Sequence, residues 1–249
     1  MIKTELINKF RKATNRLILL DYDGTLVNLA PLPEEAIPSE HLLNVLTKLI
    51  GIPQAKVIIV TGRGHKDIDK FLGHLPMTII AEHGAMNKEN GKWVNEIKDD
   101  GLWKNKVRPL LNEITLTCPK SFIEEKNFSL AWHYRNAEKN IGQIQSKKLI
   151  RILKDVAQYY NLKILDGNKV VEITTGETNK GKAIQYVIER NNYDCIICIG
   201  DDTTDEYMFE YLFKNENAIT IKVGDGNTIA KHKLDSVQEV ILFIEKLSL

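Results

Sequence analysis

Five short apolar runs, each ending directly in a polar cluster, constrain the fold of this chain more than any other feature of its sequence. The runs are residues 17–20, 56–60, 78–81, 195–199 and 218–223. Amphipathic stretches with helical spacing lie between or after them, at residues 40–49, 66–72, 181–190, 204–213 and 236–247. Apolar strands that alternate with helices are typical of a parallel sheet covered on both faces. We therefore predict an α/β fold with a doubly wound parallel sheet.

The middle of the chain, residues 87–172, has a different order of elements. A helix-like run at 102–116 leads to strand-like runs at 121–126 and 128–135, and a second helix-like run at 139–160 leads to strand-like runs at 162–165 and 169–174. This α-β-β-α-β-β order predicts a separate, smaller α/β unit inserted after the third core strand. The predicted domains are residues 1–86 with 173–249, and residues 87–172.

The bulk composition disfavours several classes of protein. The 249 residues carry a formal net charge of +1, so no strong field favours nucleic acid or an anionic membrane. No apolar run approaches the length that crosses a bilayer. Residues 1–16 mix cationic and apolar side chains, which predicts a short amphipathic helix rather than a secretory signal. We expect a cytoplasmic protein, monomeric or weakly homo-oligomeric, with no nucleic-acid and no membrane partner.

A CxxC pair, Cys195 and Cys198, lies within one of the apolar runs, which predicts a buried strand. Residues three apart in a strand point to opposite faces, so these thiols could share neither a metal ion nor a disulfide. We predict two buried cysteines that behave as small apolar side chains.

The polar clusters after the strands carry the candidate chemistry. In a doubly wound sheet, ligands bind at the carboxyl ends of the strands, so these clusters are expected to converge on one edge. The first cluster, Asp21-Tyr-Asp23-Gly-Thr25, places two carboxylates two residues apart at a turn. One of them can attack an electrophile while the other handles a proton. The alternative is an ordinary Asp-Gly turn.

A second cluster, Gly200-Asp-Asp-Thr-Thr-Asp-Glu206, has four acidic residues within six positions. Their carboxylates repel one another unless a cation offsets the charge, and such oxygen-rich sites suit Mg²⁺. An acidic helix N-terminus would explain only one or two of them. Two weaker patterns accompany this cluster. Thr61-Gly62-Arg63 follows a strand and could hold phosphate oxygens, and Lys180 begins a helix-like run and could neutralise a carboxylate and a phosphate.

Together these residues resemble the four ordered motifs of the haloacid-dehalogenase-like (HAD) phosphatases, whose core is Rossmann-like. More narrowly, the chain is similar to the trehalose-6-phosphate phosphatase family from about Leu17 to Val223. The narrower resemblance rests on Ala81-Glu-His-Gly-Ala85, Trp132-His-Tyr-Arg135, Val171-Glu172, Asn179-Lys-Gly181 and Ile199-Gly-Asp-Asp-Thr-Thr-Asp-Glu206. Thr61 stands where serine is usual in that family, and Thr174-Thr175 stands where Arg-Pro is expected.

The resemblance implies a phosphoric monoester hydrolase that converts trehalose 6-phosphate to trehalose and phosphate. Asp21 would be the nucleophile, forming an aspartyl-phosphate, and Asp23 would be the general acid and base. Two close carboxylates do not both ionise easily, which favours a protonated Asp23. Mg²⁺ would be bound by Asp21, the Asp23 carbonyl and Asp201. Asp202 and Asp205 would orient the metal waters and Lys180, and the phosphoryl group would be held by Thr61, Gly62 and Lys180.

Strand parity predicts a polar face in the inserted unit. Alternate residues of a strand point to opposite faces, so Trp132 and Tyr134 share one face while His133 and Arg135 share the other. An ordinary solvated sheet face is the alternative. The resemblance implies instead a cap that closes over the sugar. Its substrate-binding candidates are Glu124, Lys126, His133, Arg135 and Glu172, with Arg63 and His83 as further candidates from the core.

Other functions remain open at this point. Residues 176–183 nearly match a nucleotide-binding P-loop, but Ala183 occupies the position of the metal-binding hydroxyl. A protein that only senses a sugar phosphate would not need both Asp21 and Asp23. A glucosyl- or mannosyl-3-phosphoglycerate phosphatase would keep the same chemistry with another substrate, and a mutase would keep the same scaffold.

Overall fold

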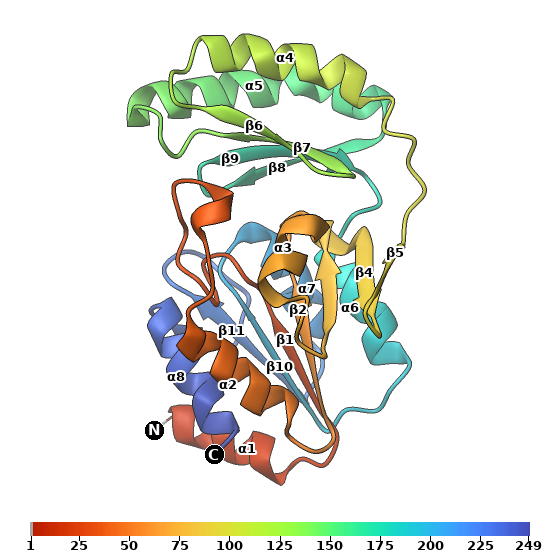
Figure 1. Cartoon of the computed structure of the whole chain (residues 1–249), viewed down its shortest axis with the longest axis vertical. Helices are drawn as coiled ribbons and strands as arrows, with labels where there is room; N and C mark the ends of the chain where they lie inside the picture. Colours follow the sequence, from red (N-terminus) through yellow and green to blue (C-terminus); the bar gives the residue numbers. More distant parts are fainter. Residues whose placement is uncertain (1) are drawn as a thin grey trace. The chain divides into compact units, whose positions relative to one another are not determined.

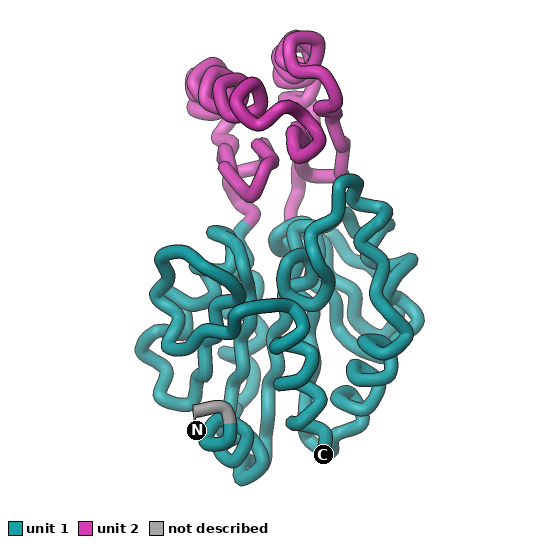
Figure 2. Tube along the Cα trace, turned by 90° about the vertical axis from the view of Figure 1, so that its left-hand side faces the viewer, with its two compact units in different colours: residues 1–96, 179–249 teal, residues 97–178 magenta. Residues whose placement is uncertain are grey.

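The computed structural model describes residues 2–249, with side chains from Thr4 onward. Two compact units make up the chain (Figure 2). The first contains the residues up to Glu96 and those from Asn179 on, and the second is Ile97–Thr178. These boundaries differ from the predicted 86/87 and 172/173. The first unit continues past residue 86 because a hairpin extends its sheet, and the second includes residues 173–178 because its last strand ends only at Thr175.

An eight-stranded sheet forms the first unit, in the order β12-β11-β10-β1-β2-β3-β4-β5 (Figure 1). All pairs from β12 to β3 are parallel, which confirms the predicted doubly wound α/β fold. The antiparallel hairpin of β4 and β5 was not predicted, so the insertion follows the fifth strand rather than the third. The strands are β1 (Arg16–Leu20), β2 (Ala55–Val60), β3 (Thr78–Ala81), β4 (Met86–Glu89), β5 (Lys92–Asn95), β10 (Cys195–Gly200), β11 (Ala218–Val223) and β12 (His232–Leu234).

Six α-helices and two 3-10 turns complete the first unit as far as the structure describes it. They are α1 (Ile2–Lys12), α2 (Glu40–Ile50), α3 (His65–Leu72), α6 (Lys180–Glu189), α7 (Thr203–Leu212) and α8 (Val237–Leu247), with η1 (Pro33–Glu35) and η2 (Glu82–Gly84). Hydroxyl side chains fix where two of the helices begin, because Ser39 accepts from the backbone N–H of Leu42 and Ser236 from that of Glu239. The predicted helix near the start is α1, while Met1 lies outside the described residues.

The parallel register brings the ends of three strands to one level. Leu20, the last residue of β1, pairs with Ile59 of β2 on one side and with Ile199 of β10 on the other. The backbone N–H of Asp21 then donates to the carbonyl of Ile199 over 3.0 Å. The polar segments that follow β1, β2 and β10 therefore begin side by side, as the sequence predicted.

Burial on both faces of the sheet explains why its strands are continuously apolar. Leu17, Leu19 and Cys198 pack with Ile184 of α6 and Met208 of α7, and the intervening residues of β1 are equally buried. Cys195 and Cys198 are buried free thiols in β10, which confirms their predicted role as small apolar side chains. Among residues 2–249, no helix combines the length and apolar character needed to cross a membrane.

The second unit has the predicted α-β-β-α-β-β order. Its four-stranded antiparallel sheet runs β6-β7-β9-β8, and its two helices cover one face of that sheet (Figure 1). The elements are α4 (Lys104–Leu116), β6 (Phe122–Glu125), β7 (Ser129–His133), α5 (Lys139–Tyr159), β8 (Leu162–Gly167) and β9 (Val170–Thr175). Leu130, Trp132, Val171 and Ile173 point into the core beneath the helices. The alternate residues of β7 and β9 therefore form the other face.

Candidate active site

A buried lysine links two aspartates that are far apart in the sequence. The Nζ atom of Lys180 donates to Oδ1 of Asp21 over 2.6 Å and to Oδ1 of Asp205 over 2.8 Å. The side chains of all three residues are almost fully buried. Burial alone would lower the pKa of Lys180, but Asp205 and Asp21 outweigh it and hold that pKa above its ordinary value. Lys180 therefore remains a cation inside the protein.

The position of Lys180 in its helix makes this charge unusual. Lys180 is the first residue of α6, whose N-cap is Asn179, and the positive end of a helix dipole disfavours a cation there. The carboxylates of Asp21 and Asp205 offset this cost. The Lys180 cation and the positive end of the helix dipole place positive charge beside Asp21, which would offset part of the charge of an approaching phosphate.

Asp205 fixes the loop between β10 and α7. Its Oδ2 atom accepts hydrogen bonds from the backbone N–H groups of Asp201 and Asp202, over 2.9 and 3.0 Å. Asp202 is the N-cap of α7 and accepts from the N–H of Thr203 over 2.7 Å. Helix capping therefore accounts for Asp202 and for part of the role of Asp205. It does not account for Asp201.

Asp21, Asp201 and Asp205 could hold a metal ion, because one ligand atom of each lies within 4.8 Å of the others. Burial is the largest cause that raises the pKa of Asp21, to about 7, and the nearby charge of Asp205 is the second. Burial, followed by Asp21, raises the pKa of Asp201 to about 9. Asp23 contributes least to the shift of Asp21, so mutual repulsion of Asp21 and Asp23 is a minor effect. Acidic groups that are this costly to ionise together fit a divalent cation.

Within this set, Asp21 and Asp201 are better placed as ligands than Asp205. Both oxygens of Asp205 already accept hydrogen bonds, from Lys180 and from the backbone. A buried lysine of β11, Lys222, donates to the carbonyl oxygen of Asp201 and so ties down the loop behind its carboxylate. These contacts agree with the predicted division between metal-binding and orienting aspartates, whose roles remain proposals.

Gly24 allows the two acidic loops to approach each other. Its φ of +80° lies in the left-handed region, which L side chains rarely adopt. A Cβ atom at this position would lie 2.1 Å from Oδ2 of Asp201. Glycine is therefore required at position 24 both by the φ of the turn and by the close carboxylate of Asp201.

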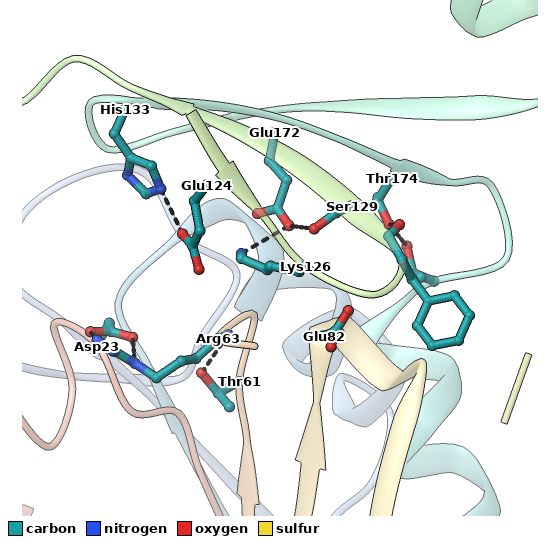
Figure 3. Close-up of polar contacts among 12 residues, drawn as sticks. Asp23, Thr61, Arg63, Glu82, Glu124, Lys126, Ser129, His133, Glu172 and Thr174 are labelled. Carbon is teal, nitrogen blue, oxygen red and sulfur yellow. Dashed lines mark hydrogen bonds and ion pairs between the residues drawn. The ribbon is translucent and has the colours of Figure 1, made fainter. Parts of the chain in front are cut away.

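Asp23 is held by Arg63 rather than by Lys180 (Figure 3). The Nε and Nη2 atoms of Arg63 donate to Oδ2 and Oδ1 of Asp23 over 3.0 and 2.5 Å. The side chain of Arg63 is 3% exposed, whereas that of Asp23 is 31% exposed. The two carboxylates of the Asp21-Tyr-Asp23 motif thus have separate cationic partners.

The Thr61-Gly62-Arg63 loop is fixed by the η2 turn. The backbone N–H of His83 donates to the carbonyl of Thr61, and that of Glu82 donates to the carbonyl of Arg63. Both Glu82 and His83 have positive φ values, of 50° and 56°. The buried His83 ring lies so close to Gly62 that a Cβ there would be 2.3 Å from its Cε1. The structure thus places His83, predicted to bind substrate, against the loop that carries Thr61.

In the second unit, most of the predicted residues form one polar cluster (Figure 3). Glu172 accepts from Nζ of Lys126 over 3.0 Å and from the hydroxyl of Ser129 over 2.5 Å. Glu124 lies 2.7 Å from Nε2 of His133. Burial alone would raise the pKa of Glu124, but Lys126 and His133 outweigh it and lower that pKa. The parity argument therefore found a connected polar face.

Arg135 follows β7, two residues after the strand ends at His133. Its Nη2 atom donates to the backbone carbonyl of Asn168 over 2.6 Å. Asn168 lies in the β8–β9 turn, so this hydrogen bond joins the end of the β7 segment to that turn.

Two residues of these clusters were not predicted. Ser129 shares a strand face with Ala131 and His133, so the same parity would have included it. Lys222 is a lone charge in the otherwise apolar strand Ala218–Val223, which is itself a sign of a buried partner.

The model of the trehalose-phosphatase family matches residues 19–238. The alpha,alpha-trehalose-phosphate synthase (UDP-forming) B of Dictyostelium discoideum is 38% identical over 251 residues, which cover 98% of this chain and 32% of that protein. The bifunctional trehalose-6-phosphate synthase/phosphatase of Thermoproteus tenax is 38% identical over 244 residues, which cover 98% and 33%. The chain thus spans about a third of the length of these curated relatives.

A solved structure of similar extent is the C-terminal domain of trehalose-6-phosphate phosphatase from C. albicans. It matches with a TM-score of 0.94 at 30% identity, covering 100% of this chain and 97% of that chain. The residues on which the sequence resemblance rests, from Asp21 to Glu206, all lie within the span of these matches.

Proposed function

This chain belongs to the trehalose-phosphatase family, and we propose that it hydrolyses trehalose 6-phosphate to trehalose and inorganic phosphate. The observation that carries the proposal is the buried contact of Lys180 with Asp21 and Asp205 beside Asp201. A sugar-phosphate sensor would have no need of a buried nucleophile with its own cation. The chemistry of the site is phosphoryl transfer to a carboxylate.

Asp21 is the nucleophile in this proposal. One of its carboxylate oxygens forms a bond to phosphorus while the bond from phosphorus to the sugar oxygen breaks, and the electron pair of that bond leaves with the sugar. Asp23 gives its proton to the departing oxygen. Asp23 then takes a proton from a water that attacks the aspartyl-phosphate, which releases inorganic phosphate and restores Asp21.

The approach of a phosphate dianion to Asp21 requires positive charge. Lys180 and the N-terminus of α6 supply part of it, and the Thr61 hydroxyl and the Gly62 N–H bind phosphoryl oxygens. Mg²⁺, bound by Asp21, the Asp23 carbonyl and Asp201, would supply the remainder and polarise the phosphoryl group. Asp205 and Asp202 keep this loop and Lys180 in place.

The polar face of the second unit is the proposed sugar-recognition surface. Glu124, Lys126 and Glu172 carry groups that can hydrogen-bond sugar hydroxyls, and all three are restrained by neighbouring side chains. His133 and Ser129 position the two glutamates. Arg135, which donates to the carbonyl of Asn168, and His83, whose ring lies against Gly62, are further substrate-binding candidates in this proposal.

A small sugar phosphate is the partner that this site implies. The other expectations remain predictions: a cytoplasmic location, no nucleic-acid or membrane partner, and a monomer or weak homo-oligomer. Size-exclusion chromatography with light scattering measures the last of these directly.

Phosphate release from a panel of sugar phosphates tests the proposed function. Wild type and Asp21→Asn are compared with Mg²⁺, on trehalose 6-phosphate, on glucosyl- and mannosyl-3-phosphoglycerate and on simple hexose phosphates. We expect trehalose 6-phosphate to give the highest kcat/KM, and the variant to lose activity by at least about 1,000-fold. Equal activity of wild type and variant would refute the assignment of Asp21, and a preference for another sugar phosphate would refute the substrate.

A further inference from the structure

Arg63 is a buried cation whose partner is the general acid of the proposed reaction. Its guanidinium donates one hydrogen bond to each carboxylate oxygen of Asp23, so the contact is bidentate. Arg63 is 3% exposed and Asp23 is 31% exposed, so the buried member is the arginine. An arrangement of this kind fixes the carboxyl group through the arginine, because the arginine itself has little room to move.

Three further contacts hold the guanidinium in place. It lies over the ring of Tyr22, 5.2 Å from the centroid, and over that of Phe71, 5.3 Å from the centroid. Its Nη1 atom donates to the carbonyl of Pro33 over 2.6 Å. Tyr22 is itself anchored, since its hydroxyl donates to the carbonyl of Ala36 over 2.8 Å. Contact with two aromatic rings combined with a fork of donors is a geometry that lysine cannot reproduce.

The backbone of Arg63 belongs to the proposed phosphate-binding loop, so the side chain that contacts Asp23 comes from that loop. The N–H of Arg63 donates to Oγ1 of Thr61 over 3.1 Å, and its carbonyl accepts from the N–H of Glu82. The loop that presents the Thr61 hydroxyl thus also sets the position of the Asp23 carboxyl. Residues 61–63 therefore contact the carboxyl group of Asp23 and also carry the Thr61 hydroxyl.

We propose that Arg63 is the positioning residue of the general acid Asp23, and not a residue that binds the sugar. This inference rests on the proposed function, and it replaces the sugar-binding role that the sequence suggested for Arg63. In the first half-reaction the proton passes from Asp23 to the sugar oxygen as the phosphorus–oxygen bond breaks, and Arg63 stabilises the carboxylate left behind. In the second, the same fork aims the carboxylate at the attacking water, whose proton it accepts.

Two substrates separate this role from a general loss of structure. The sugar oxygen of trehalose 6-phosphate leaves only with a proton, whereas p-nitrophenolate is a stable leaving group that needs none. In single-turnover experiments, we expect Arg63→Gln to slow cleavage of trehalose 6-phosphate by about 100-fold. The first turnover of p-nitrophenyl phosphate should keep its wild-type rate within about threefold. With p-nitrophenyl phosphate in excess over the enzyme, the variant should give a burst of one p-nitrophenolate per enzyme followed by slow turnover, because the later attack of water still needs Asp23.

A double-mutant cycle identifies the residue through which Arg63 acts. Asp23→Asn should show the same pattern as Arg63→Gln, and the two changes together should be no slower than Asp23→Asn alone. Arg63→Lys should also lose at least about tenfold on trehalose 6-phosphate, since it keeps the charge and loses the fork. The exposed Lys66, a few positions further along the chain, gives the matched control Lys66→Gln, with wild-type rates expected.

Three results contradict the inference. These are equal losses in the first turnover of both substrates, a further loss when Arg63→Gln is added to Asp23→Asn, and a raised KM for trehalose 6-phosphate with kcat unchanged. The last would restore Arg63 as a sugar-binding residue. Failure of the proposed function is separately visible, because wild type would then release no phosphate from trehalose 6-phosphate or Asp21→Asn would be as active as wild type.

Discussion

The Nζ atom of Lys180 lies 2.6 Å from Oδ1 of Asp21, although 159 positions separate the two residues in the sequence. Their side chains are 2% and 6% exposed. Breaking a buried ion pair by removing one partner leaves the other charge uncompensated, which is far more costly than the net worth of the pair. This contact therefore joins the stability of the first unit to its proposed chemistry.

Replacing Lys180 by methionine should damage both properties. Asp21 and Asp205 would remain buried without their cation, so the free energy of unfolding without Mg²⁺ should fall by about 3 kcal/mol. The kcat/KM for trehalose 6-phosphate should fall by at least about 100-fold. Urea unfolding and phosphate release measure the two effects. The matched control is Lys182→Met, at an exposed position of the same helix. It should change the free energy of unfolding by less than about 0.5 kcal/mol and leave kcat/KM within about twofold of wild type.

Stability without metal should fall as the pH rises. Folding raises the pKa of Asp21 from 3.8 to about 7 and that of Asp201 from 3.8 to about 9. A carboxyl group with a raised pKa binds its proton more tightly in the folded state, so the free energy of unfolding decreases as the pH rises through this interval. A divalent cation that binds the ionised carboxylates offsets this loss.

Melting curves in EDTA and in Mg²⁺ measure the effect. The increase in Tm that Mg²⁺ produces should be larger at about pH 9 than at about pH 5, by roughly 3 °C or more. Asp201→Asn, which cannot ionise, should flatten the pH dependence of the EDTA series. An increase in Tm that is independent of pH would show that these carboxylates do not bind the metal.

Gly24 and Gly91 have similar φ values, and comparing them separates the cost of backbone strain from the cost of a steric clash with the new Cβ. Gly24 has a φ of +80° and Gly91 a φ of +76°, but a Cβ on Gly91 meets nothing within 4 Å. Gly91→Ala should cost only the backbone term, about 1–2 kcal/mol. Gly24→Ala should cost more and should also weaken Mg²⁺ activation, because its Cβ displaces the carboxylate of Asp201. The Mg²⁺ dependence of phosphate release tests this, and equal metal dependence in the two variants would contradict it.

Glu172→Gln should affect substrate binding and leave the chemistry intact. It removes the charge that accepts from Lys126 and Ser129. We expect the KM for trehalose 6-phosphate to rise by roughly 10–100-fold, with kcat for p-nitrophenyl phosphate unchanged. Glu125→Gln is the matched control, since Glu125 pairs with Arg108 at an exposed position of β6 in the same sheet. If the two variants behave alike, Glu172 does not recognise the sugar.

The strands of the first unit were predictable because each buries both faces. Burial on both sides demands an unbroken apolar run, and the polar turn that follows marks its end. The β4–β5 hairpin was missed for the converse reason. Its second strand, Lys92–Asn95, is largely exposed and alternates little, so pairing along the sheet edge rather than apolar pattern makes it a strand.

The aspartates were predictable because acidic residues directly after a buried strand are conspicuous, whereas Lys180 was a weak pattern at the start of a helix-like run until the family resemblance supported it. Their partners were harder to infer. Arg63 was assigned to the sugar, and its contact with Asp23 depends on aromatic rings of Tyr22 and Phe71 that no local pattern connects. Strand parity marks Ser129, and a lone charge in a strand marks Lys222, but neither pattern identifies the partner, which is Glu172 for Ser129 and Asp201 for Lys222.

The insertion of the second unit into the first also sets an order of events during synthesis. β1 pairs with β2, made soon after it, and with β10, made only after residues 97–178 have left the ribosome. The second unit is continuous in sequence, so it can fold before β10 is available to pair with β1 in the first unit. A nascent chain therefore contains Asp21 well before it gains Lys180 and Asp205, so a product truncated within residues 97–178 lacks the lysine that contacts its proposed nucleophile.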